Sequence, residues 1–148
     1  MAYIYECKIE VHSVIDNLDQ SGLPEGEPEV SDVCSDGFIK AEEGALTLSY
    51  VEIGEGTRVS CDLLIEGEAV TIKRRGDVVF DVTLSEGKTV STVYSVPPYS
   101  FDATVRCRRI RQAMTNRGGS LSLLYSMNIG GQEKSVRMTI LAVPRAEA

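Results

Sequence analysis

The sequence predicts an all-β protein, a single antiparallel up-and-down barrel of about eight to ten strands. Short segments in which apolar and polar residues alternate recur at roughly ten-residue spacing along the chain. Turns that contain glycine, such as Glu66-Gly67-Glu68 and Arg75-Gly76-Asp77, separate these segments. Because almost every connection is a short hairpin, the strands are expected to follow one another as a meander. A meander of this many strands avoids exposed edges by closing.

In the first half of the chain, the alternating pattern begins at Tyr3 and places Cys7 on the core face. The acidic stretch from Asp16 to Glu29 has almost nothing to bury and is predicted to be a mobile loop. The glycine of Asp36-Gly37 interrupts the next segment and indicates a bulge or a turn. The strands predicted in this half cover residues 3–15, 30–40, 45–53, 57–66 and 70–75.

The second half of the chain is organised around two adjacent prolines. Pro97-Pro98 predicts an extended, non-helical turn, because each ring fixes φ and restricts the residue before it. The stretch IRQAMTN, residues 110–116, predicts one short helix that ends at Gly118-Gly119, where glycine accepts a left-handed conformation. The strands predicted in this half cover residues 78–84, 89–96, 100–107, 121–127 and 136–140.

The composition, 43% hydrophobic and 25% charged, is typical of a globular protein, and we expect residues 1–148 to form one domain. The first ten residues contain Glu6 and Lys8 where a secretory signal would be apolar, and no apolar run approaches the ~20 residues that span a bilayer. We therefore expect a cytoplasmic protein with no membrane partner. The net charge of −7 also argues against a nucleic-acid partner, because that affinity comes from Lys and Arg neutralising phosphates.

Few residues are suited to catalysis or to metal binding. His12 is the single histidine, and it alternates with charged residues on the predicted solvent face. Cys7, Cys61 and Cys107 fall on core faces, and no cysteine pair has the CxxC spacing of a zinc or redox site. The acidic loop lacks the alternating carboxylates and the fixed glycine of a calcium loop. We expect a protein that is not an enzyme and that holds neither a metal nor a cofactor.

Several stretches of the chain together resemble a known family. They are the ending Tyr50-x-Glu52, the hairpin start Ile65-Glu66-Gly67, the positions of Tyr94, Pro97 and Phe101, and the step from Gly118-Gly119 into Leu121 to Tyr125. From roughly Val33 to Val143 the chain resembles the YwiB-like family of small bacterial proteins of unknown function. The resemblance implies a calycin-like, lipocalin-type barrel and no established activity. The family's turn usually reads Thr-Pro-Tyr-Gly, whereas Pro98 stands here in the place of the tyrosine.

A barrel of this strand number has an interior wide enough either to be filled by side chains or to hold one small ligand. A ligand-binding interior is expected to use side chains with apolar bodies and few polar tips, which suit a small apolar or amphipathic molecule. The candidates are Tyr5, Tyr50, Tyr125, Met127 and Met138. We expect a non-catalytic, small-ligand-binding barrel. An interior filled by side chains remains the alternative.

Arginines around Arg106 and Arg108 form the one basic cluster of this acidic protein. These two share a predicted strand face opposite Val105 and Cys107, so they are candidates for binding a phosphate or an acidic partner. In the other interpretation they pair with Glu and Asp on neighbouring strands. The cluster supports a second hypothesis, a protein-interaction or self-association module, such as a homodimer, that acts through an outer face.

Overall fold

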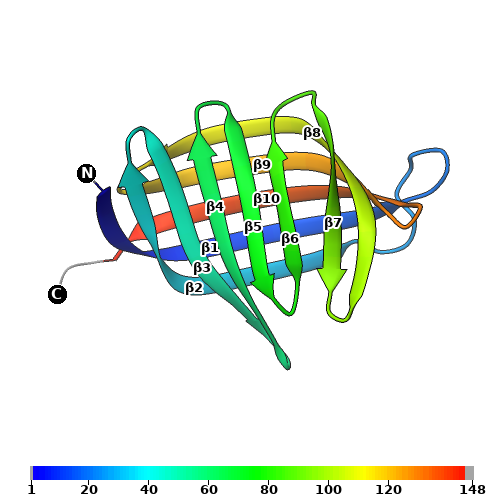
Figure 1. Ribbon diagram of the computed structural model, residues 1–148, viewed down its shortest axis with the longest axis horizontal. Coiled ribbons are helices and arrows are strands. Elements are labelled where there is room, and N and C mark those ends of the chain that lie inside the picture. Colours follow the sequence, from blue (N-terminus) through cyan, green and yellow to red (C-terminus); the bar gives the residue numbers. More distant parts are fainter. Residues whose placement is uncertain (1, 146–148) are drawn as a thin grey trace.

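The computed structural model describes residues 2–145 as one closed antiparallel barrel. Its strands are β1 (Ala2–Leu18), β2 (Glu29–Glu42), β3 (Ala45–Gly54), β4 (Thr57–Glu66), β5 (Ala69–Gly76), β6 (Val79–Leu84), β7 (Thr89–Val96), β8 (Tyr99–Thr115), β9 (Gly118–Ile129) and β10 (Gln132–Pro144). Each strand pairs with its sequence neighbours, and β1 pairs with β10 to close the barrel. In Figure 1, β3 to β7 cross the long strands β8, β9, β10 and β1 at a steep angle. The predicted meander and its closure are confirmed.

The helix predicted over residues 110–116 is wrong. This segment is the second half of β8, and it pairs with β9 through contacts such as Gln112 with Leu121. A seven-residue helix is marginal on its own, whereas the paired strand buries Met114 and packs Ile110 against the core. Residues 2–145 contain no helix, and so none that could cross a membrane.

The irregularity that the sequence predicts at Gly37 is not a bulge: the ladder between β2 and β3 stops at Phe38, next to Gly37, although both strands continue. Gly37 pairs with Cys7 in an unbroken register, and the bulge falls in β8 between Cys107 and Arg109. A Cβ atom at position 37 would lie 2.2 Å from the backbone oxygen of Ser49. This glycine therefore permits a close approach of β3 to β2.

The acidic loop is shorter than the sequence predicts, because Asp16 to Leu18 continue β1 and pair with β10. The remaining loop is held by its own hydrogen bonds. The carboxylate of Asp19 accepts hydrogen bonds from the backbone N–H groups of Ser21 and Leu23, and the Glu25 N–H donates to the Asn17 carbonyl at 2.7 Å. The loop is thus an extension of the β1–β2 hairpin (Figure 1).

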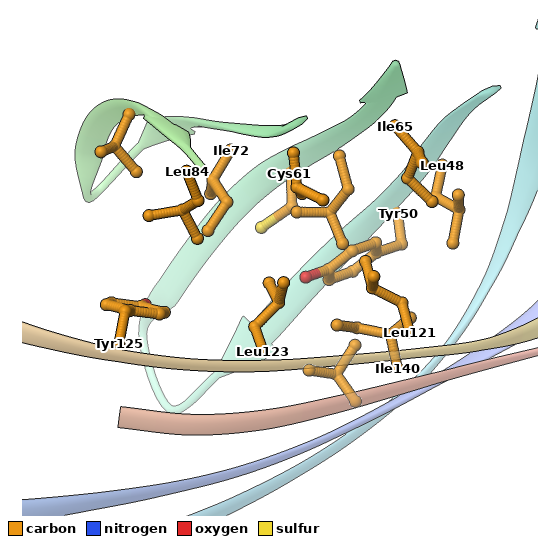
Figure 2. Close-up of a cluster of buried hydrophobic side chains, with 14 of the residues drawn as sticks. Leu48, Tyr50, Cys61, Ile65, Ile72, Leu84, Leu121, Leu123, Tyr125 and Ile140 are labelled. Carbon is orange, nitrogen blue, oxygen red and sulfur yellow. The ribbon is translucent and has the colours of Figure 1, made fainter. Parts of the chain in front are cut away.

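The core fills the middle of the barrel with apolar side chains from every strand. Period-two alternation places these residues on the inner face, as the sequence predicts. Figure 2 shows part of this cluster. Its largest fully buried members are Ile9, Ile39, Leu48, Leu63, Val70, Leu84, Val105, Leu121, Val136 and Ile140.

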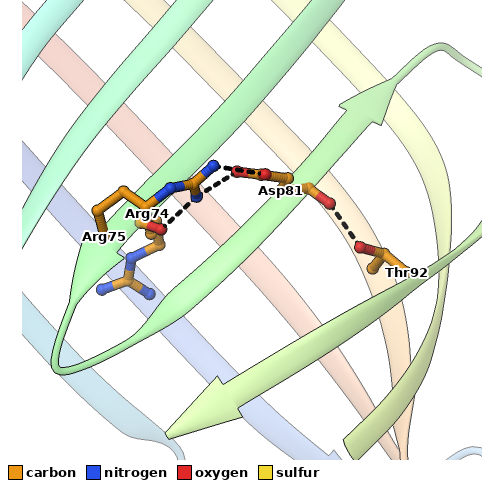
Figure 3. Close-up of polar contacts among 4 residues, drawn as sticks. All are labelled: Arg74, Arg75, Asp81 and Thr92. Carbon is orange, nitrogen blue, oxygen red and sulfur yellow. Dashed lines mark hydrogen bonds and ion pairs between the residues drawn. The ribbon is translucent and has the colours of Figure 1, made fainter. Parts of the chain in front are cut away.

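The barrel wall has its shortest ladder between β6 and β7. Only Val79 with Ser95 and Phe80 with Tyr94 pair there. Beyond them, the Thr92 hydroxyl donates a hydrogen bond of 2.6 Å to the Asp81 carbonyl in place of a backbone donor (Figure 3). This side-chain bond continues the wall where the backbone ladder ends.

Candidate functional site

An arginine lies on the inner side of the barrel. Val70, Ile72 and Arg74 alternate along β5, and the first two are buried in the core, so Arg74 points inward as well. Its neighbour Arg75 lies on the outer side, where it donates two hydrogen bonds to Asp81 at 2.5 and 2.7 Å. Figure 3 shows the two arginine side chains leaving β5 in different directions.

Arg74 forms an ion pair with Glu52 of β3. The guanidinium Nη2 donates to Glu52 Oε2 at 2.6 Å, and the two side chains are only 23% and 24% exposed. The Nε atom of Arg74 is enclosed by protein atoms and has no hydrogen-bond partner. Burial alone lowers the pKa of Arg74. Glu52 and the neighbouring Cys61 together raise it by more than burial lowers it, so the net pKa is raised and the guanidinium stays charged.

Arg74 stands in the middle of a row of inward residues that runs across six neighbouring strands. Each member pairs directly with the next, from β3 to β8. We call this row the belt. Its members, in order around the wall, are Tyr50, Cys61, Arg74, Phe80, Tyr94 and Phe101.

The belt separates the apolar core from one end of the barrel. On the core side, the next row is apolar apart from Thr92 on β7, and it includes Leu48, Leu63, Ile72 and Val82. On the other side lie the tips of the β3–β4, β5–β6 and β7–β8 hairpins, at the lower edge of Figure 1. We call this side the hairpin end.

Inward-facing apolar side chains become exposed at the hairpin end. Phe101 and Tyr99 lie on the same side of β8 as the buried Ala103, yet they are 45% and 67% exposed. The Phe80 and Tyr94 rings pack at 5.4 Å between centroids, with a tilt of 59°. The belt therefore contains both the largely buried Arg74 and, at its β8 end, the solvent-exposed ring of Phe101.

The phenols and the thiol around Arg74 are held in their neutral forms. Burial raises the pKa of Tyr50 well above its ordinary value, that of Cys61 to about 11 and that of Tyr125 to about 12. Figure 2 shows Tyr50 and Cys61 within the same buried cluster. Near neutral pH these groups are protonated hydrogen-bonding groups, and the thiol is a poor nucleophile.

The structure brings together some of the residues that the sequence selects as lumen candidates. Tyr50, Tyr125 and Met127 are buried, and the charge of Arg74 acts on both tyrosines. Met138 is partly buried against the core. Tyr5 lies apart from them, with its ring 5.8 Å from the guanidinium carbon of Arg117.

The sequence reasoning missed Arg74 and Glu52, although the pattern contains a signal for both. Alternation puts Arg74 on the same face as Val70 and Ile72, and it puts Glu52 on the same face as Tyr50. A charged residue on the apolar face of a predicted strand indicates either a strand end or a buried polar site. Two of them on nearby strands, with opposite charges, favour the buried polar site.

The hollows described over residues 2–145 lie away from the belt. Their volumes are about 490, 410, 480 and 790 Å³, and none of the four is lined by a lumen candidate or a belt residue. The largest lies beside the acidic loop, and the 410 Å³ hollow lies on the outer face of β1, β2 and β10. The 490 Å³ hollow opens onto core residues Ile65 and Val70 at the other end of the barrel.

The arginines of β8 are exposed, and the carboxylate nearest to them along the strand is that of Glu86, which accepts a hydrogen bond of 2.8 Å from the Ile110 N–H. Arg106 pairs across the sheet with Thr89 and Ser126, and Arg109 pairs with Leu124. Within the described residues, neither Arg106 nor Arg108 forms an ion pair. The register thus gives no support to pairing with acidic residues on neighbouring strands.

His12 lies on the outer face, as the alternation predicts. Its Nδ1 atom is 2.5 Å from Asp32 Oδ1, and both side chains are exposed. Glu10 and Cys34 line the same surface hollow. Over residues 2–145, no three histidine, cysteine or acidic side chains are grouped so that they could hold a metal ion.

Comparison with known proteins gives a family and a fold. Residues 10–140 match the model of a family described as a domain of unknown function, DUF1934. The chain is similar in structure to the ywiB protein from Bacillus subtilis, with a TM-score of 0.82, 20% sequence identity, and coverage of 97% of this chain and 94% of that chain. No curated protein matches the sequence. The likeness to a solved structure at this identity shows the barrel fold.

Proposed function

The chain belongs to the DUF1934 family of domains of unknown function, and on that premise we propose that it is a non-catalytic barrel that binds one small, partly apolar molecule. The binding place in this proposal is the hairpin end of the interior, where the belt meets solvent. Apolar side chains pack together in the core, so the ligand is expected to contact the belt and not the middle of the core.

The observation that carries the proposal is the Arg74–Glu52 pair inside the barrel. An ion pair removed from water is often no more stable than well-packed apolar side chains of the same volume. An unpartnered, enclosed N–H costs about 1–3 kcal/mol in addition. Arg74 has both features, which favours a role in recognition over a role in stability.

The apolar side chains at the hairpin end support a ligand that is partly apolar. Val96, Tyr99 and Phe101 are large hydrophobic residues of the β7–β8 hairpin, and all three are exposed. Apolar surface beside a few convergent polar groups is the usual lining of a small-molecule site. The chemistry around Arg74 supports binding without catalysis, because Tyr50 and Cys61 keep their protons near neutral pH.

The proposal places the protein in the cytoplasm. All four cysteines are free thiols, and Cys34 is exposed. Free thiols suit a reducing compartment.

Native mass spectrometry of the protein purified from its own host tests the proposed function. Wild type is expected to carry a small molecule at near one-to-one stoichiometry, which denaturing extraction releases. Phe101→Ala removes an inward aromatic ring at the hairpin end and is expected to lower occupancy about fivefold or more. Val93→Ala is the matched control, because Val93 lies on the outer side of the same hairpin and is 48% exposed against 45% for Phe101. A wild-type protein without any bound molecule would contradict the proposal.

A second candidate function is favoured by one specific observation, the outer face of β8. Its arginines are exposed, and those that pair with β9 face uncharged residues there. Guanidinium groups bind carboxylates in a bidentate geometry, so this face suits an acidic segment of a protein partner or of a second copy of the chain.

Binding of a deca-glutamate peptide at low and high salt tests this second function. The wild-type protein is expected to bind the peptide more weakly as salt rises. The triple variant Arg106→Gln, Arg109→Gln, Arg111→Gln is expected to lose the binding, while Arg58→Gln on another surface keeps it. Equal binding by the triple variant would contradict a role for this face.

A further inference from the structure

We infer that the molecule bound at the hairpin end is electrically neutral and offers a carbonyl-type hydrogen-bond acceptor to Arg74, with an apolar or aromatic body against the belt. This inference rests on the proposed function, since it names the class of ligand for the same site. It separates this barrel from one that would bind a carboxylic acid through its interior arginine.

The charge of Arg74 is already balanced by the protein. Glu52 Oε2 lies 2.6 Å from Arg74 Nη2, and the two side chains are equally shielded from water. A ligand carboxylate would add a second negative charge beside Glu52 in a partly desolvated site, where like charges disfavour one another. The groups that share the field of Arg74 are Cys61, Tyr94 and Tyr50, and they supply no further positive charge.

The hydrogen-bonding capacity of Arg74 is not balanced in the same way. A guanidinium has five N–H donors and no acceptor. Nη2 donates to Glu52 and the Nε–H is enclosed by protein atoms, so the donors that a ligand can reach on this 23% exposed side chain are those of Nη1, which forms no hydrogen bond within residues 2–145. A carbonyl oxygen is a pure acceptor that adds no charge, so it supplies what the site lacks.

The belt next to Arg74 determines the body of the ligand. Phe80, Tyr94 and Phe101 follow Arg74 in direct register on β6, β7 and β8. The Phe80 and Tyr94 rings are tilted against each other, and Phe101 is 45% exposed at the hairpin end. Aromatic faces of this kind pack best against flat apolar groups. The ligand class is therefore a small ketone, ester or amide with an apolar or aromatic body.

Three probes that share a naphthalene ring test the inference by equilibrium dialysis against the whole chain. They are 2-acetylnaphthalene, 2-naphthoate and 2-ethylnaphthalene, which carry a neutral acceptor, an anionic acceptor and no acceptor. The ketone is expected to bind at least about tenfold more tightly than either of the other two. If 2-naphthoate binds most tightly, the site takes anions and the inference is wrong while the proposed function stands. If 2-ethylnaphthalene equals the ketone, the acceptor has no role and the inference is also wrong.

Two variants sharpen the test. Glu52→Gln removes the counter-charge, so the affinity for 2-naphthoate is expected to rise at least about tenfold while that for the ketone changes less than about threefold. Arg74→Lys keeps the charge and removes the guanidinium with its Nη1 donors, so the ketone is expected to bind no better than 2-ethylnaphthalene. A ketone preference that survives Arg74→Lys would overturn the assignment to Arg74. If neither variant folds, the three wild-type affinities decide whether the inference holds. If the wild-type protein binds none of the probes and carries no molecule from its host, the proposed function itself is contradicted.

Discussion

At the residue scale, Arg74 combines three properties that are unfavourable for a purely structural side chain. It is charged, it lies on the inner side of β5, and its Nε–H has no partner. Glu52 offsets the charge but not the missing hydrogen bond. The neutral phenol of Tyr50 and the neutral thiol of Cys61 add hydrogen-bond donors but no negative charge to these surroundings.

The Arg74–Glu52 pair is predicted to cost stability when only one partner is removed. Arg74→Met leaves the Glu52 carboxylate partly buried and unpaired, and we expect a loss of about 2–3 kcal/mol in the free energy of unfolding, measured in urea. The double variant Arg74→Met, Glu52→Met is expected to recover most of this loss. Arg75→Met, which breaks the exposed pair with Asp81, is the control and is expected to cost less than Arg74→Met. A double variant less stable than Arg74→Met would show that the pair is mainly structural.

Cys61 is predicted to make the protein lose stability at alkaline pH. Burial raises its pKa from 9.0 to about 11 in the folded state. This contribution to stability is therefore complete below pH 9 and is lost as the pH rises from about 9 to about 11, because the unfolded chain loses its proton first. Two pKa units correspond to about 2–3 kcal/mol.

Urea unfolding of wild type and Cys61→Ala between pH 8 and pH 11 measures this effect. The stability difference between the two proteins is expected to shrink by about 2–3 kcal/mol across that range. Val59→Ala, at another inward position of β4, is the packing control, and its difference from wild type is expected to stay constant. A constant difference for Cys61→Ala would contradict the buried, neutral thiol.

At the element scale, alternation along single strands contains enough information to predict most of the barrel. Thr57 to Glu66 and Thr89 to Val96 are strands with the predicted bounds, because each is flanked by turn residues and shows an unbroken period of two. The stretch from Ile110 to Asn116 suggests a helix, because its local pattern is short and ambiguous. Pairing with β9, a contact that depends on the whole fold, decides it in favour of a strand.

Gly37 shows a limit of the same local reasoning. A glycine within a strand indicates either a bulge or a close approach, and the sequence alone does not distinguish them. The position of Ser49 on the neighbouring strand decides the matter, since its carbonyl occupies the place of a side chain. The belt could not be predicted from single strands either, because its register across six strands depends on how the strands pair.

Gly37→Ala is predicted to destabilise the barrel more than Gly44→Ala. The new methyl group at position 37 would lie 2.2 Å from a backbone oxygen and 2.8 Å from Ile9 Cδ1, and we expect a loss of about 3 kcal/mol. Gly44 has φ of +82° and open space around it, so alanine there adds only backbone strain of about 1–2 kcal/mol. Urea unfolding of both variants tests the order, and a Gly37→Ala protein as stable as Gly44→Ala would contradict the close packing of β2 on β3.

At the scale of the whole molecule, closure gives the barrel two different parts. Most of the interior is a packed apolar core to which all ten strands contribute. At the hairpin end, the belt adds a paired charge, an unpartnered donor and exposed aromatic rings. The outer surface adds the arginine face of β8 to an otherwise acidic protein. The proposed site thus lies where the closed fold leaves inward side chains uncovered.

The most direct test of this account is an NMR titration that follows the arginine Nε–H resonances while 2-acetylnaphthalene is added. The resonance that disappears in Arg74→Lys is expected to shift as the ligand's oxygen accepts a hydrogen bond from the same guanidinium, with the backbone signals of Phe80, Tyr94 and Phe101 shifting alongside it. Saturating probe that leaves this resonance in place, or that shifts only the arginines of β8, would contradict the assignment of the binding site to the hairpin end.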